Sequence, residues 1–268
     1  MLWLQALLIM PDFLHYYAEI MNLNQIATIE AIDISYGFSN SKANQKMISD
    51  ITLSIFPGEF TLITGDLSSG KSTFLATISG LLRLDRGKIL IADKELGRLN
   101  NSELDRFHLI NCGFIFQRIN LSNELTVLDN LLLSLSCGIT ASHQEAMTRA
   151  TKALNIVGLK HKKDIYPNEL RDNEKQRVAI ARAIVKSPRY LFADEPTSHL
   201  DNYDCQVAID ILSFIAHNQR GTVVVASQDN RLIRHADRII TLKEGKIIHD
   251  TYLTHSIMNK TTSLYANS

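Results

Sequence analysis

The sequence predicts an α/β fold, in which a core of buried strands carries an antiparallel β element near its N-terminal end and an inserted helical subdomain over about residues 118–185. Short apolar runs predict the core, because strands covered on both faces of a sheet read as near-continuous hydrophobic segments. Such runs lie at residues 60–64, 190–193 and 222–226. The inserted stretch spaces its apolar residues at helical intervals, which predicts helices packed on the core.

The other elements follow from alternation and turn residues. Alternating apolar side chains predict a strand over residues 26–37, and a second apolar strand is predicted over 51–55. A helix is expected over residues 71–82, directly after a Gly/Ser loop. A hairpin that turns at Glu244 and Gly245 closes the domain.

Composition excludes several classes of protein. The chain has 268 residues with 28 Lys and Arg against 28 Asp and Glu, and zero net charge argues against a dedicated nucleic-acid binder, which needs surplus cations. Hydrophobic residues make up 45% of the chain, so it can bury a full core and is not intrinsically disordered. The 3 cysteines are scattered and form no CxxC pair, which favours a reducing compartment over a disulfide framework or a zinc site.

The N-terminal segment contains apolar clusters but does not match a targeting signal. Residues 1–20 include no Lys or Arg, and Pro11 and Asp12 interrupt the apolar run. A secretory signal needs a positive region, and a spanning helix needs about 20 nearly continuous apolar residues. We therefore expect neither an export signal nor a transmembrane segment. The expected organisation is an N-terminal extension, one domain and a tail over residues 1–25, 26–250 and 251–268.

A phosphate-binding loop is predicted between a strand and a helix. The pattern GxxxxGK[ST] is complete in Gly65, Asp66, Leu67, Ser68, Ser69, Gly70, Lys71 and Ser72. The glycines let the backbone turn so that successive N–H groups point at an anion, and the helix that follows directs its positive end to the same place. Lys71 supplies charge for the β- and γ-phosphates, and Ser72 supplies a ligand for Mg²⁺.

Two carboxylates follow the predicted strand at residues 190–193. Asp194 stands at the strand tip, where it can hold Mg²⁺ through water, and Glu195 can polarise an attacking water molecule. Two acids after a strand are commonly only part of a solvated loop. The complete phosphate loop in the same chain favours the catalytic interpretation.

With these motifs the chain resembles the ATP-binding subunits of ABC transporters, from about Ile29 to Asp250. The matching motifs come in the family's order: the aromatic Tyr36, the phosphate loop through Thr73, Phe116-Gln117, Asp194-Glu195, and the D-loop at residues 198–201. Within the family, residues 114–117, 125–130 and 176–183 are similar to the lipoprotein-release and macrolide-export type. The cell-division type of ABC ATPase is close to the same group.

The resemblance implies a P-loop NTPase (RecA-like) core that binds ATP and Mg²⁺. It implies nucleotide contacts from Tyr36, from the loop residues Gly65 to Thr73 and from Gln117. It implies Mg²⁺ contacts from Ser72, Gln117 and Asp194, and catalytic roles for Glu195 and for Gln228.

The chain departs from the family at the signature segment. Where the family has Leu-Ser-Gly-Gly, this chain has Leu170, Arg171, Asp172 and Asn173. In the family this segment crosses a dimer and binds the γ-phosphate in the partner's site, and glycine permits the close approach. Asp172 brings a negative charge toward the triphosphate, and two like charges about 4 Å apart repel by roughly 4 kcal/mol at an effective dielectric near 20.

A second departure follows the apolar run at residues 222–226. The family has a histidine where this chain has Gln228, between Ser227 and Asp229. Glutamine donates a hydrogen bond but does not become cationic. Loss of one charge-stabilising donor costs roughly 3 kcal/mol of barrier, or about a hundredfold in rate. The alternative is that Gln228 is a harmless replacement, which keeps the hydrogen bond of the histidine and leaves the rate unchanged.

Two functions remain open at this point. The first is an ATPase that hydrolyses ATP slowly and drives a separate membrane-spanning subunit through the surface near Gln117 to Asn130. The second is a nucleotide-binding regulatory subunit with little turnover, in which ATP shifts a docking equilibrium. An unrelated P-loop GTPase or small-molecule kinase is a weaker alternative, because the chain has no NKxD-type base-recognition segment.

Partners and location follow from the resemblance. A chain of this family pairs head-to-tail, as a homodimer or as a heterodimer with a second ABC ATPase, and it takes a membrane-spanning transporter subunit as its partner. We expect the protein at the cytoplasmic face of a membrane, with no nucleic-acid partner. The sequence does not identify what is transported or in which direction.

Overall fold

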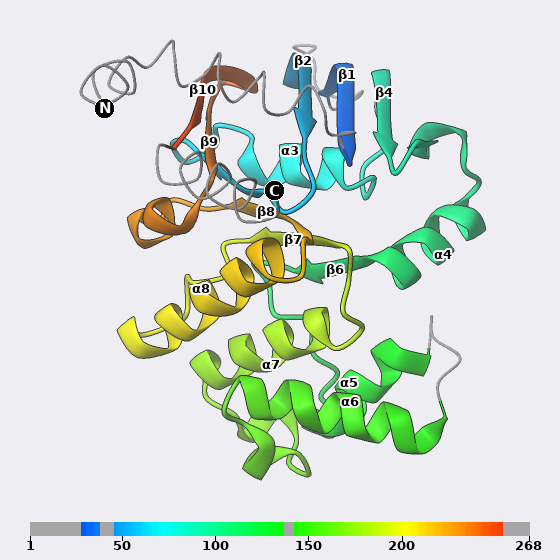
Figure 1. Cartoon of the computed structure of the whole chain (residues 1–268), viewed down its shortest axis with the longest axis vertical. Coiled ribbons are helices and arrows are strands. Elements are labelled where there is room, and N and C mark those ends of the chain that lie inside the picture. The colour runs from blue at the N-terminus through cyan, green and yellow to red at the C-terminus, as the bar shows by residue number, and fades with distance from the viewer. Residues whose placement is uncertain (1–27, 38–45, 137–141, 254–268) are drawn as a thin grey trace, which may run out of the picture.

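The computed structural model describes residues 28–37, 46–136 and 142–253. One sheet is antiparallel and has 4 strands in the order β2-β1-β4-β5. It lies across the upper part of Figure 1. Its strands are β1 (Ile29–Gly37), β2 (Lys46–Ile55), β4 (Arg86–Ile91) and β5 (Lys94–Glu95). This sheet is the antiparallel element that the sequence predicts.

The second sheet has 6 strands in the order β10-β9-β3-β8-β7-β6. Strands β9, β3, β8, β7 and β6 are parallel, whereas β10 is antiparallel to β9. These strands are β3 (Phe60–Thr64), β6 (Cys112–Ile115), β7 (Tyr190–Asp194), β8 (Thr222–Ala226), β9 (Arg238–Lys243) and β10 (Lys246–Tyr252). Parallel pairing brings the carboxyl ends of β3, β6, β7 and β8 to one edge of the sheet.

The helices other than α4 occupy three places around these sheets (Figure 1). Helix α3 follows the phosphate loop, α8 runs beside the central sheet, and α5, α6 and α7 form the helical subdomain at the bottom of the view. The α-helices are α3 (Lys71–Ile78), α4 (Asn101–Asn111), α5 (Val127–Ser136), α6 (His143–Ile156), α7 (Asp172–Ile184) and α8 (Asn202–His217). Short 3₁₀ turns are η1 (Leu96–Arg98), η2 (Lys160–Lys162), η3 (Pro167–Glu169) and η4 (Asn230–His235).

The central sheet divides two hydrophobic clusters, as the alternation of side chains along a strand requires. On β7, Leu191 packs with α7 and α8 in one cluster, whereas Phe192 packs with α3 and the antiparallel sheet in the other. On β8, Val223 and Val225 face the first cluster and Val224 faces the second. The central strands are therefore covered on both faces, as their continuous apolar runs predict.

The structure corrects some predicted bounds and adds two α-helices. Strand β2 begins at Lys46 rather than at residue 51, because its first residues pair with β1. Helix α3 ends at Ile78 rather than at residue 82, because Gly80 turns the chain with a φ of 78°. Helices α4 and α8 were not predicted. Helix α4 has a readable signal, since Asn100 and Glu103 form a capping box.

The predicted boundaries meet the described residues only in part. The N-terminal extension over residues 1–25 lies outside the described residues, and so does most of the tail. Strand β10 continues to Tyr252, past the predicted domain end at residue 250. In the described ranges, none of the helices has the length and apolar character needed to cross a membrane.

Candidate functional site

Most of the predicted site residues meet at the carboxyl edge of the central sheet, whereas Tyr36 lies on the antiparallel sheet. The phosphate loop follows β3, Asp194 ends β7, and Ser227 follows β8. Strand β8 lies between β3 and β7 in the sheet, so the loop after β8 stands between the phosphate loop and the two acids. Parallel pairing thus assembles residues that are far apart in the sequence.

The phosphate loop has the backbone that its glycines allow. Gly65 has a φ of 144° and Gly70, the N-cap of α3, has a φ of 100°, both in the range that favours glycine. A Cβ atom at position 65 would lie 2.2 Å from the carbonyl oxygen of Leu242. The β9–β10 hairpin supports the loop from this side, since the N–H of Gly245 donates to the Ser69 carbonyl at 3.0 Å.

Lys71 lies inside the loop, with only 8% of the residue exposed. Its Nζ donates to the carbonyl oxygens of Gly65 at 2.8 Å and Asp66 at 2.9 Å. An ammonium group has three N–H donors, so these bonds hold the charge in the loop and leave a donor for a phosphate oxygen. The Lys71 position therefore matches the role that the motif predicts.

The Ser69 hydroxyl is a buried polar group without a hydrogen-bond partner among the described residues. Buried hydroxyls are normally paired, and an unpaired one calls for an explanation such as a missing ligand group. Ser69 lies in the loop whose N–H groups are suited to an anion. A phosphate oxygen is a suitable partner for this hydroxyl, so the loop fits a nucleotide phosphate.

Ser72 and Asp194 are in direct contact, although 122 residues separate them: the Ser72 Oγ donates to the Asp194 Oδ1 at 2.9 Å. Burial raises the pKa of the Asp194 carboxyl, and the hydrogen bond from Ser72 offsets this rise only in part. A hydroxyl and a carboxylate are the hard oxygen ligands that Mg²⁺ prefers. The pair therefore fits the magnesium ion that the resemblance implies.

Glu195 follows Asp194 with a φ of 46°, which is unusual for a residue other than glycine. Its N–H donates to the carbonyl of Ala226 at 2.8 Å. Its Oε2 accepts a hydrogen bond from the Ser227 hydroxyl at 2.7 Å. The side chain is thus held at the end of β8, beside the magnesium pair.

Gln228 is exposed at the phosphate loop, and its Nε2 donates to the Gly65 carbonyl at 3.0 Å. The amide therefore lies on the loop that holds Lys71 and not on the Glu195 carboxylate. This placement agrees with a donor directed to the phosphate end of the site.

Tyr36 and Gln117 lie farther from the loop. Tyr36 is half-buried on β1 opposite Ile48, and the side chain of Ile48 would lie 3.3 Å from a Cβ at Gly70. Ile48 on β2 therefore lies between Tyr36 and the start of α3. Gln117 is exposed just after β6, at the same sheet edge as Asp194, and among the described residues no hydrogen bond joins it to the phosphate loop.

The altered signature segment lies at the start of α7. Arg171 and Asp172 are exposed, and the Arg171 N–H donates to the Glu174 carboxylate at 3.1 Å. The Asn173 amide donates to Asp204 on α8 at 2.8 Å. The segment is therefore an ordered helix start that presents a cation and an anion to solvent, where the family has serine and glycine.

Sequence reasoning did not assign a role to two residues of the site. Ser227 bonds to Glu195, and Asp229 holds Thr197 from the loop after β7 at 2.7 Å. The available signal was their position, since both follow the valine-rich run of β8 at the edge where the phosphate loop and the acids meet.

A family model described as "ABC transporter" matches residues 48–198. The chain belongs to this family. Among its relatives, the lipoprotein-releasing system ATP-binding protein LolD of Buchnera aphidicola is 33% identical over 85% of this chain and 99% of that protein. The bacitracin export ATP-binding protein BceA of Halalkalibacterium halodurans is 35% identical over 83% of this chain and 87% of that protein.

Another relative is a longer protein. The macrolide export ATP-binding/permease protein MacB of Chlorobaculum tepidum is 34% identical over 83% of this chain, and the chain spans only 34% of that relative's length. Among solved structures, a dimeric ATP-binding cassette in a post-hydrolysis state with ADP and Pi has a TM-score of 0.81 at 31% identity, covering 84% of this chain and 98% of that one. The chain is thus an ATP-binding subunit of the ABC type, a class of ATP hydrolases, with the fold that the sequence predicts.

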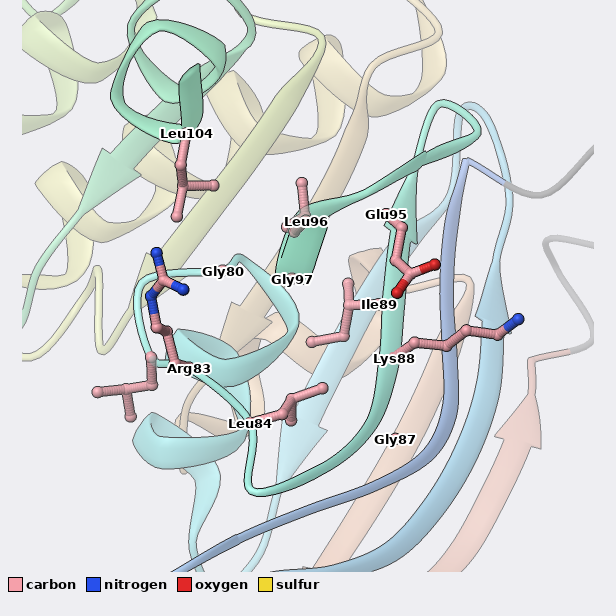
Figure 2. A pocket seen from close by; sticks show the side chains of 11 residues that line it. Gly80, Arg83, Leu84, Gly87, Lys88, Ile89, Glu95, Leu96, Gly97 and Leu104 are labelled. Carbon is pink, nitrogen blue, oxygen red and sulfur yellow. The ribbon is translucent and has the colours of Figure 1, made fainter. Parts of the chain in front are cut away.

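A surface hollow lies apart from this site (Figure 2). It is formed after α3, along β4 and at α4, and its lining includes Leu84, Ile89, Leu96 and Leu104. None of the predicted site residues lines it. The nucleotide chemistry therefore belongs to the sheet edge and not to this hollow.

Proposed function

We propose that the chain hydrolyses Mg²⁺-bound ATP at the carboxyl edge of its central sheet and that this hydrolysis drives a separate membrane-spanning transporter subunit. The contact of 2.9 Å between the Ser72 Oγ and the Asp194 Oδ1 carries the proposal. It joins the phosphate loop to the acid that ends β7, which is the arrangement that a magnesium nucleotide requires.

The residues at the sheet edge have roles that their positions support. Lys71 and the loop N–H groups bind the phosphates and stabilise negative charge on them. Ser72 and Asp194 hold Mg²⁺, which when bound neutralises charge on the β- and γ-phosphates. Glu195 accepts a proton from the attacking water, and Gln228 donates a hydrogen bond at the phosphate end. Gln117 and Tyr36 contact the metal and the adenine, respectively, as the resemblance implies.

The functional unit is a head-to-tail dimer. The dimeric cassette to which the chain is similar supports this assembly. In a homodimer, Arg171 and Asp172 face the phosphates of both sites, and the negative charge of Asp172 slows turnover. In a heterodimer with an intact ABC ATPase, the phosphate loop of this chain receives an unaltered signature, and one site is fully formed.

The membrane partner docks beside Gln117. A hollow between β6, α5 and α7 has a partly apolar lining that includes Phe114, Phe116, Leu133 and Arg182. Phe116 and Leu133 are exposed large apolar side chains, and such patches mark interaction sites. We place the chain at the cytoplasmic face of a membrane, held there by this partner, as relatives named for export and lipoprotein release suggest.

A second function is supported by the two departures from the family. Arg171 and Asp172 are exposed at the start of α7, and Gln228 replaces a histidine. A chain that binds ATP without turnover would act as a nucleotide-gated subunit, in which ATP shifts docking or dimerisation.

Phosphate release from the purified protein with ATP and Mg²⁺ separates the two functions. The parent is compared with Glu195→Gln, and nucleotide binding is measured for both. The proposed hydrolase predicts clear turnover by the parent and a large loss in Glu195→Gln with ATP binding retained. Equal rates in the two proteins would contradict it, and ATP binding without turnover in either would support the gated subunit.

A further inference from the structure

The Ser227 hydroxyl makes two hydrogen bonds whose directions are fixed. The backbone N–H of Asp229 donates to the Ser227 Oγ at 3.1 Å. The same oxygen lies 2.7 Å from the Glu195 Oε2, and an ionised carboxylate is an acceptor only. In the bond with Asp229 the proton comes from the Asp229 N–H. The single proton of the Ser227 hydroxyl is therefore directed at Glu195.

The loop that carries Ser227 is anchored to the loop that carries Glu195. The Asp229 carboxylate accepts hydrogen bonds from Thr197 at 2.7 Å and from Arg231 at 2.8 Å. Burial acts to raise the pKa of Asp229, but these donors outweigh it and lower the pKa to about 2. Arg231 also donates to Asn202 at the start of α8. A charged network thus ties the chain after β8 to the chain after β7.

Glu195 needs such support. Its backbone has a positive φ, and a glutamate side chain has several rotatable bonds whose freedom must be restricted for it to face a water molecule. The neighbouring Gln228 does not hold the Glu195 side chain, because its amide donates to the Gly65 carbonyl. The Ser227 hydroxyl occupies one carboxylate oxygen and leaves the other for a proton from water.

We propose that Ser227 is a positioning residue for Glu195: its hydroxyl, held by the Asp229 N–H, fixes the carboxylate in the orientation that accepts the proton of the attacking water. This inference rests on the proposed role of Glu195 in hydrolysis. It assigns to the serine after β8 a task that does not depend on a histidine at position 228.

The test compares Ser227→Ala, Ser227→Thr, Glu195→Gln and the double variant Ser227→Ala/Glu195→Gln by steady-state phosphate release. We expect Ser227→Ala to lower kcat about tenfold or more, with KM for ATP and nucleotide affinity unchanged. Ser227→Thr keeps the hydroxyl and should retain most of the rate. In the Glu195→Gln background, Ser227→Ala should add no further loss, because the group that it positions is already gone.

Ser79→Ala is the matched control, because Ser79 is also a buried serine and its hydroxyl bonds a carbonyl, that of Ala76, outside the site. It should keep the parent kcat. Three outcomes would overturn the positioning role alone. They are an unchanged kcat in Ser227→Ala, a change in the KM for ATP instead of in kcat, and an equal loss of rate in the alanine and threonine variants. Equal rates of the parent and Glu195→Gln would instead overturn the proposed function and this inference with it.

Discussion

Lys71 and Gln228 donate hydrogen bonds to the same acceptor, the carbonyl oxygen of Gly65, at 2.8 and 3.0 Å. One donor comes from the helix after β3 and the other from the loop after β8. The glutamine that replaces the family's histidine therefore still lies at the phosphate loop. What the substitution removes is the capacity for positive charge at this position.

Gln228→His should raise kcat by up to about 100-fold, since a donor that can carry charge stabilises the charge that develops on the γ-phosphate. ATP affinity should change little, because Lys71 and the loop N–H groups bind the phosphates in both proteins. Steady-state phosphate release and nucleotide titration separate the two quantities. Gln228→Leu, which removes the donor, should be slower than the parent, and an unchanged kcat in both variants would show that position 228 takes no part in turnover.

Gly65→Ala should abolish nucleotide binding and destabilise the fold. The new Cβ would lie 2.2 Å from the Leu242 carbonyl and 2.7 Å from the Ser69 Oγ, at a φ of 144°, so the loop or the hairpin must move. Gly97→Ala is the matched control, because no atom lies within 4 Å of a Cβ at that position. Thermal unfolding and ATP titration of both variants check this. Normal ATP binding by Gly65→Ala would contradict the loop geometry.

Local pattern was sufficient to predict the central strands and the loop between β3 and α3. Strand β3 and strand β8 have the bounds that their apolar runs predict. The spacing of Gly65, Gly70 and Lys71 defines a phosphate loop because the motif acts through adjacent backbone groups. In these segments the local pattern and the fold agree.

Contacts between distant segments were beyond local reasoning. The Ser72–Asp194 pair spans 122 residues, and its formation depends on strand order, which no single segment encodes. The acceptor of Gln228 and the bond from Ser227 to Glu195 depend on the same order, because β8 lies between β3 and β7. Motif matching pointed to the phosphate loop and the two acids, but it predicted neither the bonds among them nor the contribution of Ser227.

Asp194→Asn should stabilise the protein measured without nucleotide and Mg²⁺ while it abolishes Mg²⁺-dependent hydrolysis. Burial raises the pKa of Asp194 in the folded protein, so its charge costs stability at every pH above that raised pKa. Removal of the charge removes this cost. Differential scanning calorimetry at pH 7 should show a higher Tm for the variant, and phosphate release should show no turnover. A lower Tm would mean that the Ser72 bond outweighs burial.

Stability in acid should depend on Glu174, which holds the altered signature segment. Only 3% of its side chain is exposed, and the carboxylate accepts bonds from Lys162 Nζ at 2.6 Å and the Arg171 N–H at 3.1 Å. Burial acts to raise its pKa, but these donors outweigh burial and lower the pKa from 4.5 to about 2. A carboxylate with a lowered pKa stabilises the fold above its unfolded pKa, and the contribution is lost as pH falls from about 4.5 toward about 2.

Glu174→Gln should therefore be less stable than the parent at pH 6 by on the order of 2 to 3 kcal/mol, and the difference should shrink at pH 3. Urea unfolding at the two pH values measures it. Glu145→Gln is the control, because Glu145 forms an exposed ion pair with Arg149 on α6, and such pairs contribute less than about 1 kcal/mol. A difference between parent and Glu174→Gln that is the same at pH 6 and pH 3 would show that the ionised carboxylate is not what holds Arg171 at the start of α7.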